Sequence, residues 1–318
     1  MVYIIVLNWN GYLDTISCLE SVTKLAESSF KVVVCDNNSS DNSLGHIQAW
    51  YKNNNTKNLY LASADYCCFS SPEEFSGYQS LTDKGFYAIQ TGSNLGYAGG
   101  NNVGIRFALA QKDMSHVWVL NNDTEVDPHA LSAMLTRCEA DPSIGICGSK
   151  MVYFDRRDTL QGLGGVYNRW LGTTKHYAGH APSHMVFDED VVSKNIDYVI
   201  GASMLISRNL LEKVGLLCED YFLYFEELDL TLRAKKKGFL TAVSINSVVF
   251  HKEGASVSRS DISDYYFVKN KFLITKSFFK FYICFVWCAT LITLTKRIFR
   301  FELKKTINVL RILFGLSV

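Results

Sequence analysis

Short runs of β-branched residues alternate with segments of helix length from Tyr3 to Asn121. Buried parallel strands have this apolar composition, and each needs a crossover helix to reach the next strand. The alternation therefore predicts an α/β fold in which helices flank a mainly parallel, nucleotide-binding sheet. We expect strands at 3–8, 31–35, 86–90 and 116–121, and helices at 12–26, 41–52, 100–112 and 128–140.

Composition narrows the class of protein. The chain has 318 residues, 48% of them hydrophobic, which is enough for one main globular domain and a smaller part. Its 32 Lys and Arg nearly balance 31 Asp and Glu, so we expect no nucleic-acid partner. The nine cysteines are odd in number and scattered, which favours a reducing, cytoplasmic setting. The apolar start lacks a basic region and predicts a buried strand instead of a signal peptide.

The rest of the main domain is less regular. Residues 53–84 show no clear periodicity and predict a surface insertion, while the glycine-rich stretch 155–195 predicts a mobile loop or hairpin on the acceptor side of a site. After it we expect a strand at 196–207, helices at 208–214 and 226–237, and a last strand at 240–250.

The C-terminal segment is apolar and then basic. Its uninterrupted apolar part, Phe281–Thr295, is 15 residues long, whereas a membrane-spanning helix needs about 20. Lys and Arg residues interleaved with apolar ones follow, as in an amphipathic helix that lies on anionic lipid. The alternative is a helix docked on the domain. We expect a main domain over 1–275 and a membrane-association segment over 276–318, in contact with the membrane surface through 278–314.

Two acidic sites are candidates for chemistry. Asp123 follows the strand Val117–Leu120 and should emerge at the carboxyl edge of the sheet, where a divalent cation and substrate phosphates can share one carboxylate. A turn or helix cap is the alternative. Glu226, Glu227 and Asp229 open a predicted helix after an apolar tetrapeptide, so they can project from a dry cleft in which a carboxylate acts as a base. Stabilisation of the helix dipole alone is the alternative.

Polar side chains also follow the first two strands, and a glycine-rich loop follows the third. Amides and a carboxylate at neighbouring strand ends can read the base and ribose of a nucleotide, although the same residues form turns well. The loop opens a helix, where backbone N–H groups can approach a ligand. The nucleotide-sugar candidates are Asn8, Asn10, Asp36, Asn37, Ser39, Asn94, Gly96 and Asn101.

Taken in order, these segments resemble the inverting family 2 glycosyltransferases of GT-A fold, in particular the bacterial rhamnosyltransferase-like branch that builds surface polysaccharide. The resemblance covers roughly residues 1–275. It is carried by Leu7–Gly11, Asp36–Asp41, Asn94–Asn102, Leu120–Thr124, Gly201–Leu205 and Phe222–Asp229.

The resemblance implies roles for individual residues. Asp36 would contact the pyrimidine base, and Asn122 would lie beside the ribose. Asp123 and His251 would hold Mg²⁺ or Mn²⁺ against the donor diphosphate. Glu227 would be the catalytic base, next to Glu226 and Asp229 as further catalytic candidates. Gly201, Ala202 and Tyr224 would contact the donor or acceptor sugar.

This sequence departs from the family pattern at two positions. The metal motif often has two acids, whereas Asn121 and Asn122 leave Asp123 alone. The base is more often Asp after Glu, whereas Glu227 is one methylene longer.

These observations predict a metal-dependent, inverting glycosyltransferase at the inner face of the cell membrane. The resemblance to this branch alone implies dTDP-rhamnose as the expected donor, and the expected acceptor is a lipid-linked saccharide in O-antigen or capsule synthesis. One alternative is transfer of galactofuranose, a hexose or an N-acetylhexosamine; another is a non-catalytic protein that binds sugar nucleotides. A nicotinamide-dependent oxidoreductase is disfavoured because no glycine fingerprint follows the first strand.

Overall fold

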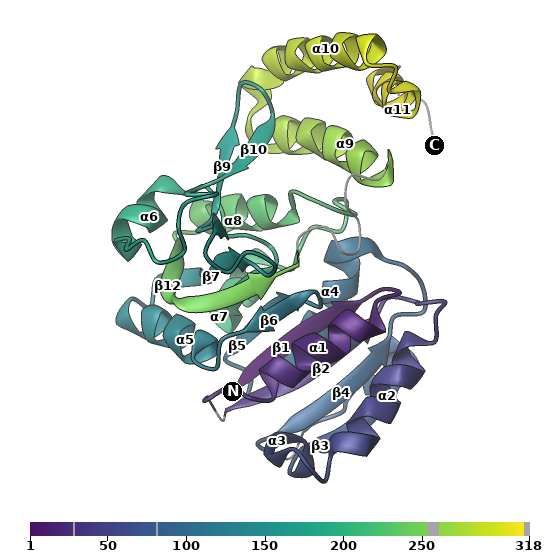
Figure 1. Ribbon diagram of the computed structural model, residues 1–318, viewed down its shortest axis with the longest axis vertical. Helices are drawn as coiled ribbons and strands as arrows, with labels where there is room; N and C mark the ends of the chain where they lie inside the picture. The colour runs from purple at the N-terminus through teal and green to yellow at the C-terminus, as the bar shows by residue number, and fades with distance from the viewer. Residues whose placement is uncertain (28, 81, 253–260, 315–318) are drawn as a thin grey trace.

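The computed structural model describes residues 1–27, 29–80, 82–252 and 261–314, and it is built on one large mixed sheet covered by helices (Figure 1). The strands are β1 (Val2–Asn8), β2 (Phe30–Asp36), β3 (Asp65–Phe69), β4 (Gly85–Gln90), β5 (His116–Asn121), β6 (Thr124–Val126), β7 (Ile144–Tyr153), β8 (Leu160–Gly162), β9 (Gly165–Asn168), β10 (Thr173–His176), β11 (Ser203–Ser207) and β12 (Leu240–His251).

The α-helices and 3₁₀ turns alternate with these strands. They are α1 (Tyr12–Val22), α2 (Ser43–Asn54), α3 (Leu59–Ala62), η1 (Pro72–Phe75), α4 (Gly96–Ala110), α5 (Ala130–Ala140), α6 (Glu189–Asn195), α7 (Arg208–Val214), α8 (Glu226–Lys236), α9 (Asp261–Phe278), η2 (Lys280–Tyr282), α10 (Ile283–Phe299) and α11 (Leu303–Phe314).

The strand order is β3-β4-β2-β1-β5-β11-β7-β12-β6, with β8 beside β7 and a separate β9–β10 hairpin. The five strands from β3 to β5 are mutually parallel, which confirms the predicted parallel sheet. Beyond them, β11 runs antiparallel to both β5 and β7. In-register pairing sets Asn8 opposite Asp36 and Leu7 opposite Asn121, so three strand ends meet at one edge.

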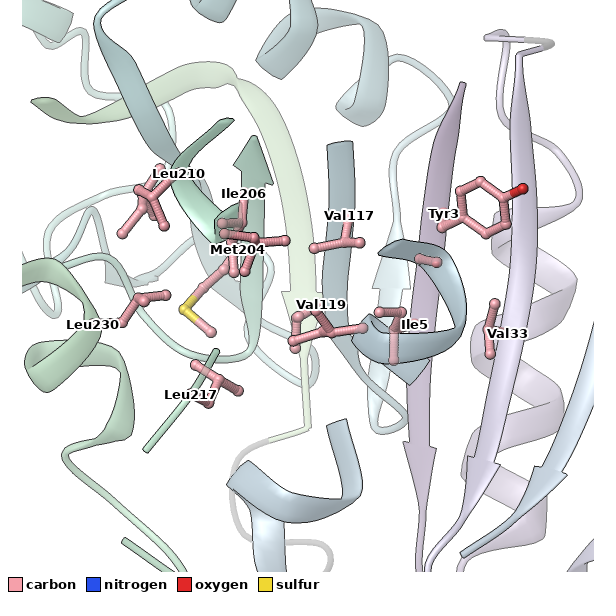
Figure 2. Packing of buried hydrophobic residues seen from close by; sticks show 14 of the residues in the cluster. Tyr3, Ile5, Val33, Val117, Val119, Met204, Ile206, Leu210, Leu217 and Leu230 are labelled. Carbon is pink, nitrogen blue, oxygen red and sulfur yellow. The ribbon is translucent and has the colours of Figure 1, made fainter. Parts of the chain in front are cut away.

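The core lies on both faces of the sheet because successive strand residues point to opposite sides. Tyr3, Ile5 and Val119 belong to one buried cluster, and Figure 2 shows them beside side chains from β2 and β11. Ile4 and Val6 belong to the opposite cluster. Complete burial of one such aliphatic side chain is worth about 1.5–3 kcal/mol, so these strands are fixed firmly enough to hold polar groups at their ends.

Several predicted boundaries are wrong. The 53–84 segment is not an irregular insertion: it contains α3, η1 and β3, and β3 forms the sheet edge beside β4. Helix α4 begins at Gly96 instead of residue 100, so the expected glycine-rich loop is largely its first turn. The glycines allow close packing on the sheet, since a Cβ on Gly100 would lie 2.5 Å from Leu7. The strand expected at 196–207 is confined to β11.

The C-terminal helices form an arm beyond the hairpin (Figure 1). Phe272 of α9 packs with Val286 of α10 and Val309 of α11, while Ile274 of α9 packs with Tyr221 and Phe225 of the main domain. Helix α9 therefore spans the division expected after residue 275 and contacts both sides of it. Residues 280–299 form 20 helical residues, and an 18-residue window within them has a mean hydropathy of 1.4. The segment is long and apolar enough to cross a membrane by length and composition alone.

Candidate active site

A saturated hydrogen-bond network surrounds Asp36 at the end of β2. Its Oδ1 accepts from Asn8 Nδ2 at 2.7 Å and from Ser39 Oγ at 2.6 Å, and its Oδ2 accepts from the Ser39 N–H at 3.1 Å and from Gln90 Nε2 at 2.9 Å. The backbone of Asn10 donates to Ser39 Oγ at 2.9 Å. The structure thus brings together four of the predicted nucleotide residues, and it adds Gln90, which the sequence analysis missed.

A second amide network joins β2 to the start of α4. Asn37 Nδ2 donates to Asn94 Oδ1 at 3.0 Å and to the Gly96 carbonyl at 3.1 Å. Gly96 has φ +70°, and a Cβ there would lie 2.3 Å from the Phe222 carbonyl oxygen, so only glycine fits. Gly96, predicted as part of a ligand-binding loop, therefore allows the start of α4 to lie close to the segment before α8. Asn101 bonds Tyr97 within α4 instead of pointing at the strand ends.

Asp123 and His251 meet through pairing of β6 with β12. Thr124 lies opposite His251 in that ladder, and His251 Nε2 is 3.2 Å from Asp123 Oδ1. His251 Nδ1 lies 2.9 Å from Gln161 Oε1 of β8. Because an amide oxygen only accepts, Nδ1 donates to Gln161, which leaves Nε2 as the ring nitrogen that faces Asp123. Gln161, missed from the sequence, therefore selects the tautomer that a metal ligand needs.

The Asp123–His251 pair has the chemistry of a partial cation site. Asp123 Oδ1 is buried and accepts no hydrogen bond from the described residues. Among those residues no cluster of three or more His, Cys, Asp or Glu side chains suits a metal. A divalent cation here would therefore take its remaining ligands from water or substrate, as Mg²⁺ commonly does with phosphates.

Glu226 and Glu227 open α8, where Glu226 is buried and Glu227 is partly buried. Within the part of the chain that the structure describes, one carboxyl oxygen of each is buried without a hydrogen-bond partner. Burial raises the pKa of Glu227 to about 7. Burial, followed by the charge of Glu227, raises the pKa of Glu226 well above its usual range. Both neighbouring acids therefore favour the protonated form more than a free carboxyl does, and Glu227 is the one whose pKa lies near neutral pH.

The turn that presents these acids has an unusual backbone. Tyr224 and Phe225 have φ values of +70° and +76°, a region that costs non-glycine residues energy and often marks functional sites. Asn270 of α9, which is fully buried, holds the turn: its Nδ2 donates to the carbonyls of Leu223 at 2.8 Å and Tyr224 at 3.1 Å. No pattern in the sequence indicated a role for Asn270.

Tyr97 connects the two acidic sites. Its hydroxyl donates to the Gly201 carbonyl at 2.7 Å. Burial and then the carboxylates of Glu226, Glu227 and Asp123 raise its pKa. A Cβ on Gly201 would lie 3.8 Å from Glu227 Cδ, so the absent side chain leaves space beside the carboxylate. Gly201 thus lies beside Glu227, and Tyr97 lies near enough to the predicted catalytic and metal-binding acids to be influenced by their charges.

Three other candidates are engaged elsewhere. Asp229 lies two residues beyond Glu227, on another face of the helix, and it pairs with Arg233 at 2.6 Å. That ion pair favours a structural role over the catalytic role predicted for Asp229. Asn122 Nδ2 donates to Thr15 Oγ1 at 3.0 Å, which ties it to α1. Ala202 is buried, and its carbonyl accepts the Asn121 N–H at 3.0 Å.

The sequence model of the family described as "Glycosyltransferase like family 2" matches residues 87–264, more than half of the chain. The chain therefore belongs to glycosyltransferase family 2, and it is an enzyme of the glycosyltransferase class.

Two relatives carry functional names. The low-salt glycan biosynthesis hexosyltransferase Agl10 of Haloferax volcanii is 27% identical over 234 residues, covering 70% of this chain and 72% of its own length. The N-acetylglucosaminyl-diphospho-decaprenol L-rhamnosyltransferase of Mycobacterium tuberculosis is 24% identical over 188 residues, covering 55% of this chain and 61% of its own length.

Solved structures share the fold. The mannosyltransferase PcManGT of Pyrobaculum calidifontis, in complex with GDP-Man and Mn²⁺, is similar over 99% of this chain and 74% of its own, with a TM-score of 0.57 and 12% identity. GalNAc-T7, with UDP, GalNAc and Mn²⁺, is similar over 85% of this chain and 47% of its own, with a TM-score of 0.58 and 13% identity. The GT-A fold predicted from the sequence is thereby confirmed.

Proposed function

We propose that the enzyme transfers a sugar from a nucleoside diphosphate to an acceptor hydroxyl with inversion, using Glu227 as the base. The observation that carries this proposal is the convergence of Glu227 and the Asp123–His251 pair around Tyr97. One site supplies a proton acceptor, and the other supplies ligands for a cation that would offset the diphosphate charge.

The transfer is a single displacement. The acceptor oxygen forms a bond to the anomeric carbon as the bond from that carbon to the diphosphate oxygen breaks, and the acceptor proton passes to Glu227. Glu227 is suited to this step because its pKa of about 7 lies near the operating pH. Glu226 lies beside it, and burial together with the charge of Glu227 raises the pKa of Glu226 as well.

Asp123 and His251 would hold Mg²⁺ or Mn²⁺, which supplies electrostatic stabilisation of the departing diphosphate. Mn²⁺ in two structurally similar enzymes supports this cofactor. Asp36 and its partners are arranged to receive the nucleotide at the adjacent strand ends, and the Asn37–Asn94 pair fixes the start of α4 beside them.

Relatives guide the choice of substrates. Because one is named a rhamnosyltransferase acting on a lipid diphosphate sugar, we infer L-rhamnose from dTDP-rhamnose as donor and a lipid-linked saccharide of O-antigen or capsule synthesis as acceptor. The second relative, named a hexosyltransferase, makes another hexose the alternative donor.

The C-terminal arm supports work at a membrane surface. We infer that α10 and α11 contact the cytoplasmic leaflet, because their exposed residues combine large apolar side chains with Lys296, Arg300 and Lys304. Two basic residues of the arm also form ion pairs with α9: Arg297 with Asp264 at 2.6 Å, and the exposed Lys304 with Asp261 at 3.7 Å. The exposed apolar set is Phe281, Phe285, Trp287, Leu291, Ile292, Ile298, Phe299, Phe301, Leu303, Ile307 and Phe314.

The testing experiment is a thermal-shift and donor-hydrolysis screen of the full chain with a panel of sugar nucleotides, first with Mn²⁺ or Mg²⁺ and then with chelator. We expect one donor to stabilise the enzyme only when metal is present. Stabilisation that survives chelator would contradict the metal assignment. Binding without turnover in any acceptor mixture would favour a non-catalytic sugar-nucleotide-binding protein.

A further inference from the structure

The β9–β10 hairpin runs from the catalytic acids to the C-terminal arm (Figure 1). At its base, the Gly165 N–H donates to the Tyr198 carbonyl at 2.8 Å. Tyr198 is buried close enough to Glu227 that the carboxylate, after burial itself, raises the tyrosine pKa. At its tip, the Trp170 ring packs edge-on against Tyr282 and Phe285, with centroids 4.9 Å and 4.6 Å apart.

A cavity of about 530 Å³ lies along this hairpin, and Tyr282 of η2 is part of its lining. Two cations, Arg169 and Lys175, line it together with the polar groups of Asn168 and Thr173. No carboxylate is part of the lining. Neither cation enters an ion pair with any residue that the structure describes, and both are exposed. The cavity is therefore suited to an anionic group.

The side of the cavity next to the arm is apolar. Trp170 is 51% exposed and packs against the exposed ring of Phe285, and the next residue at the hairpin tip, Leu171, is 47% exposed. The Arg169 guanidinium lies 5.1 Å from the Phe279 ring centroid, which holds it at this boundary. A ligand that fits both sides carries an anionic head and a hydrocarbon chain.

The distance to the catalytic site also fits. A strand rises about 3.3 Å per residue, so β9 covers about 10 Å between Gly165, near Tyr198 and Glu227, and Asn168, at the cavity. A sugar ring joined to a diphosphate has a comparable length. A head group held by Arg169 and Lys175 would therefore leave its sugar hydroxyl within reach of Glu227.

We propose that this cavity binds the diphosphate and the first isoprene units of a polyprenyl-diphosphate acceptor, with Arg169 and Lys175 on the phosphates and Trp170 on the hydrocarbon. The proposal rests on the proposed function, of which it specifies the acceptor site. It also assigns the arm a role: the arm places the apolar wall of the cavity at the membrane surface from which the acceptor comes.

The test uses the full chain and farnesyl diphosphate as a short probe, with binding followed by calorimetry. We expect the Arg169→Ala/Lys175→Ala double variant to bind farnesyl diphosphate at least 10-fold more weakly than wild type. Inorganic pyrophosphate, which lacks the hydrocarbon, should bind wild type at least 10-fold more weakly than farnesyl diphosphate. The control variant Lys52→Ala/Lys57→Ala removes two exposed lysines near α2, far from the hairpin, and should bind like wild type.

Unchanged farnesyl diphosphate binding in the Arg169→Ala/Lys175→Ala variant would overturn the proposal, as would equal affinity for pyrophosphate. A second outcome would also overturn the proposal. If wild type bound phosphatidylglycerol vesicles equally well with and without polyprenyl diphosphate, and the variant lost this binding, the two cations would be assigned to lipid head groups. Metal-dependent donor stabilisation is measured on the same proteins. If donor stabilisation is absent from wild type, the proposed function is contradicted. If the Arg169→Ala/Lys175→Ala variant keeps donor stabilisation but loses farnesyl diphosphate binding, the loss concerns the acceptor cavity and not the donor site.

Discussion

Two groups of side chains near the carboxyl ends of the strands contrast in how their polar atoms are satisfied. They are the proposed nucleotide site around Asp36, called the nucleotide edge below, and the proposed catalytic site of Asp123, Glu226 and Glu227, called the catalytic edge. At the nucleotide edge, both oxygens of Asp36 accept two hydrogen bonds each from protein donors. At the catalytic edge, Asp123, Glu226 and Glu227 each keep a buried carboxyl oxygen without a hydrogen-bond partner among the described residues. Buried polar groups are normally paired. Single atoms elsewhere, such as Trp50 Nε1 and Thr306 Oγ1, are also unpaired, but among the described residues the unpaired buried carboxyl oxygens are those of the second set, which calls for a functional explanation.

The contrast separates preorganisation from reactivity. A saturated network fixes side-chain positions and favours one conformation, which suits the reading of a rigid nucleotide. Unpaired carboxylates in a dry site cost stability but remain free to bind a cation or take a proton. Substitutions at the two edges should therefore have different consequences.

The largest effect is expected at Glu227. Glu227→Gln keeps the shape of the side chain but removes the proton acceptor, so transfer should fall about 10²–10⁴-fold. Donor binding with Mn²⁺, measured by thermal shift, should stay at the wild-type level. A variant that lost donor binding, or that kept more than a tenth of the activity, would argue against Glu227 as the base.

The next effect concerns the metal ligands. His251→Ala should abolish Mn²⁺-dependent donor stabilisation, and Gln161→Leu, which frees the imidazole tautomer, should weaken metal affinity about 10–100-fold. Calorimetric titration of Mn²⁺ in the presence of donor measures both. The exposed His129→Ala serves as control. If Gln161→Leu bound Mn²⁺ with the same affinity as wild type, the hydrogen bond from His251 to Gln161 would have no effect on metal binding.

A smaller effect is expected from the strained turn. Asn270→Leu removes two hydrogen bonds to the carbonyls of residues 223 and 224, which are worth about 1–3 kcal/mol, so kcat should fall roughly 10-fold as the acids lose their position. The donor KM should change little. Asn308→Leu is the matched control, because Asn308 bonds a carbonyl of α9 away from the turn. Equal kinetic losses in both variants would indicate general destabilisation.

At the nucleotide edge the loss should appear mainly as stability. Asp36→Asn replaces one acceptor oxygen by an NH₂ group that faces other hydrogen-bond donors. We expect the free energy of unfolding to fall by about 1–3 kcal/mol, and the variant to bind the sugar-nucleotide donor more weakly. Denaturant unfolding with and without donor measures the two effects. A stability equal to wild type would mean that the network is not the rigid element inferred here.

The smallest effect is a stability gain at the catalytic edge. Because burial raises the pKa of Glu227 to about 7, the native state binds more protons than the unfolded state between about pH 4.5 and 7, and stability falls as pH rises through this range. Glu227→Gln removes the titrating carboxyl, and with it this loss of stability at higher pH. Its Tm should exceed wild type at pH 8, and the difference should vanish below pH 4.5. A constant difference at every pH would attribute the effect to packing.

Much of this architecture follows from the sequence. The apolar runs of β1 and β2 predict parallel neighbours, and parallel neighbours necessarily bring Asn8 and Asp36 to one edge. The placement of Asp123 after β5 and of the acids at the start of α8 is equally local. These features depend on strand period, helix starts and nearest-neighbour pairing, which the chain specifies within short stretches.

Tertiary structure alone decided which distant groups complete the site. Gln161 reaches His251 across 90 positions, Tyr97 reaches Gly201 across 104, and Asn270 reaches the turn before α8 across 46 and 47. Glutamine, tyrosine and asparagine carry no periodic signal, and their partners are set by the order in which β11, β7 and β12 insert into the sheet. That order is fixed by burial of the whole core, a sum over many distant contacts that no local segment contains.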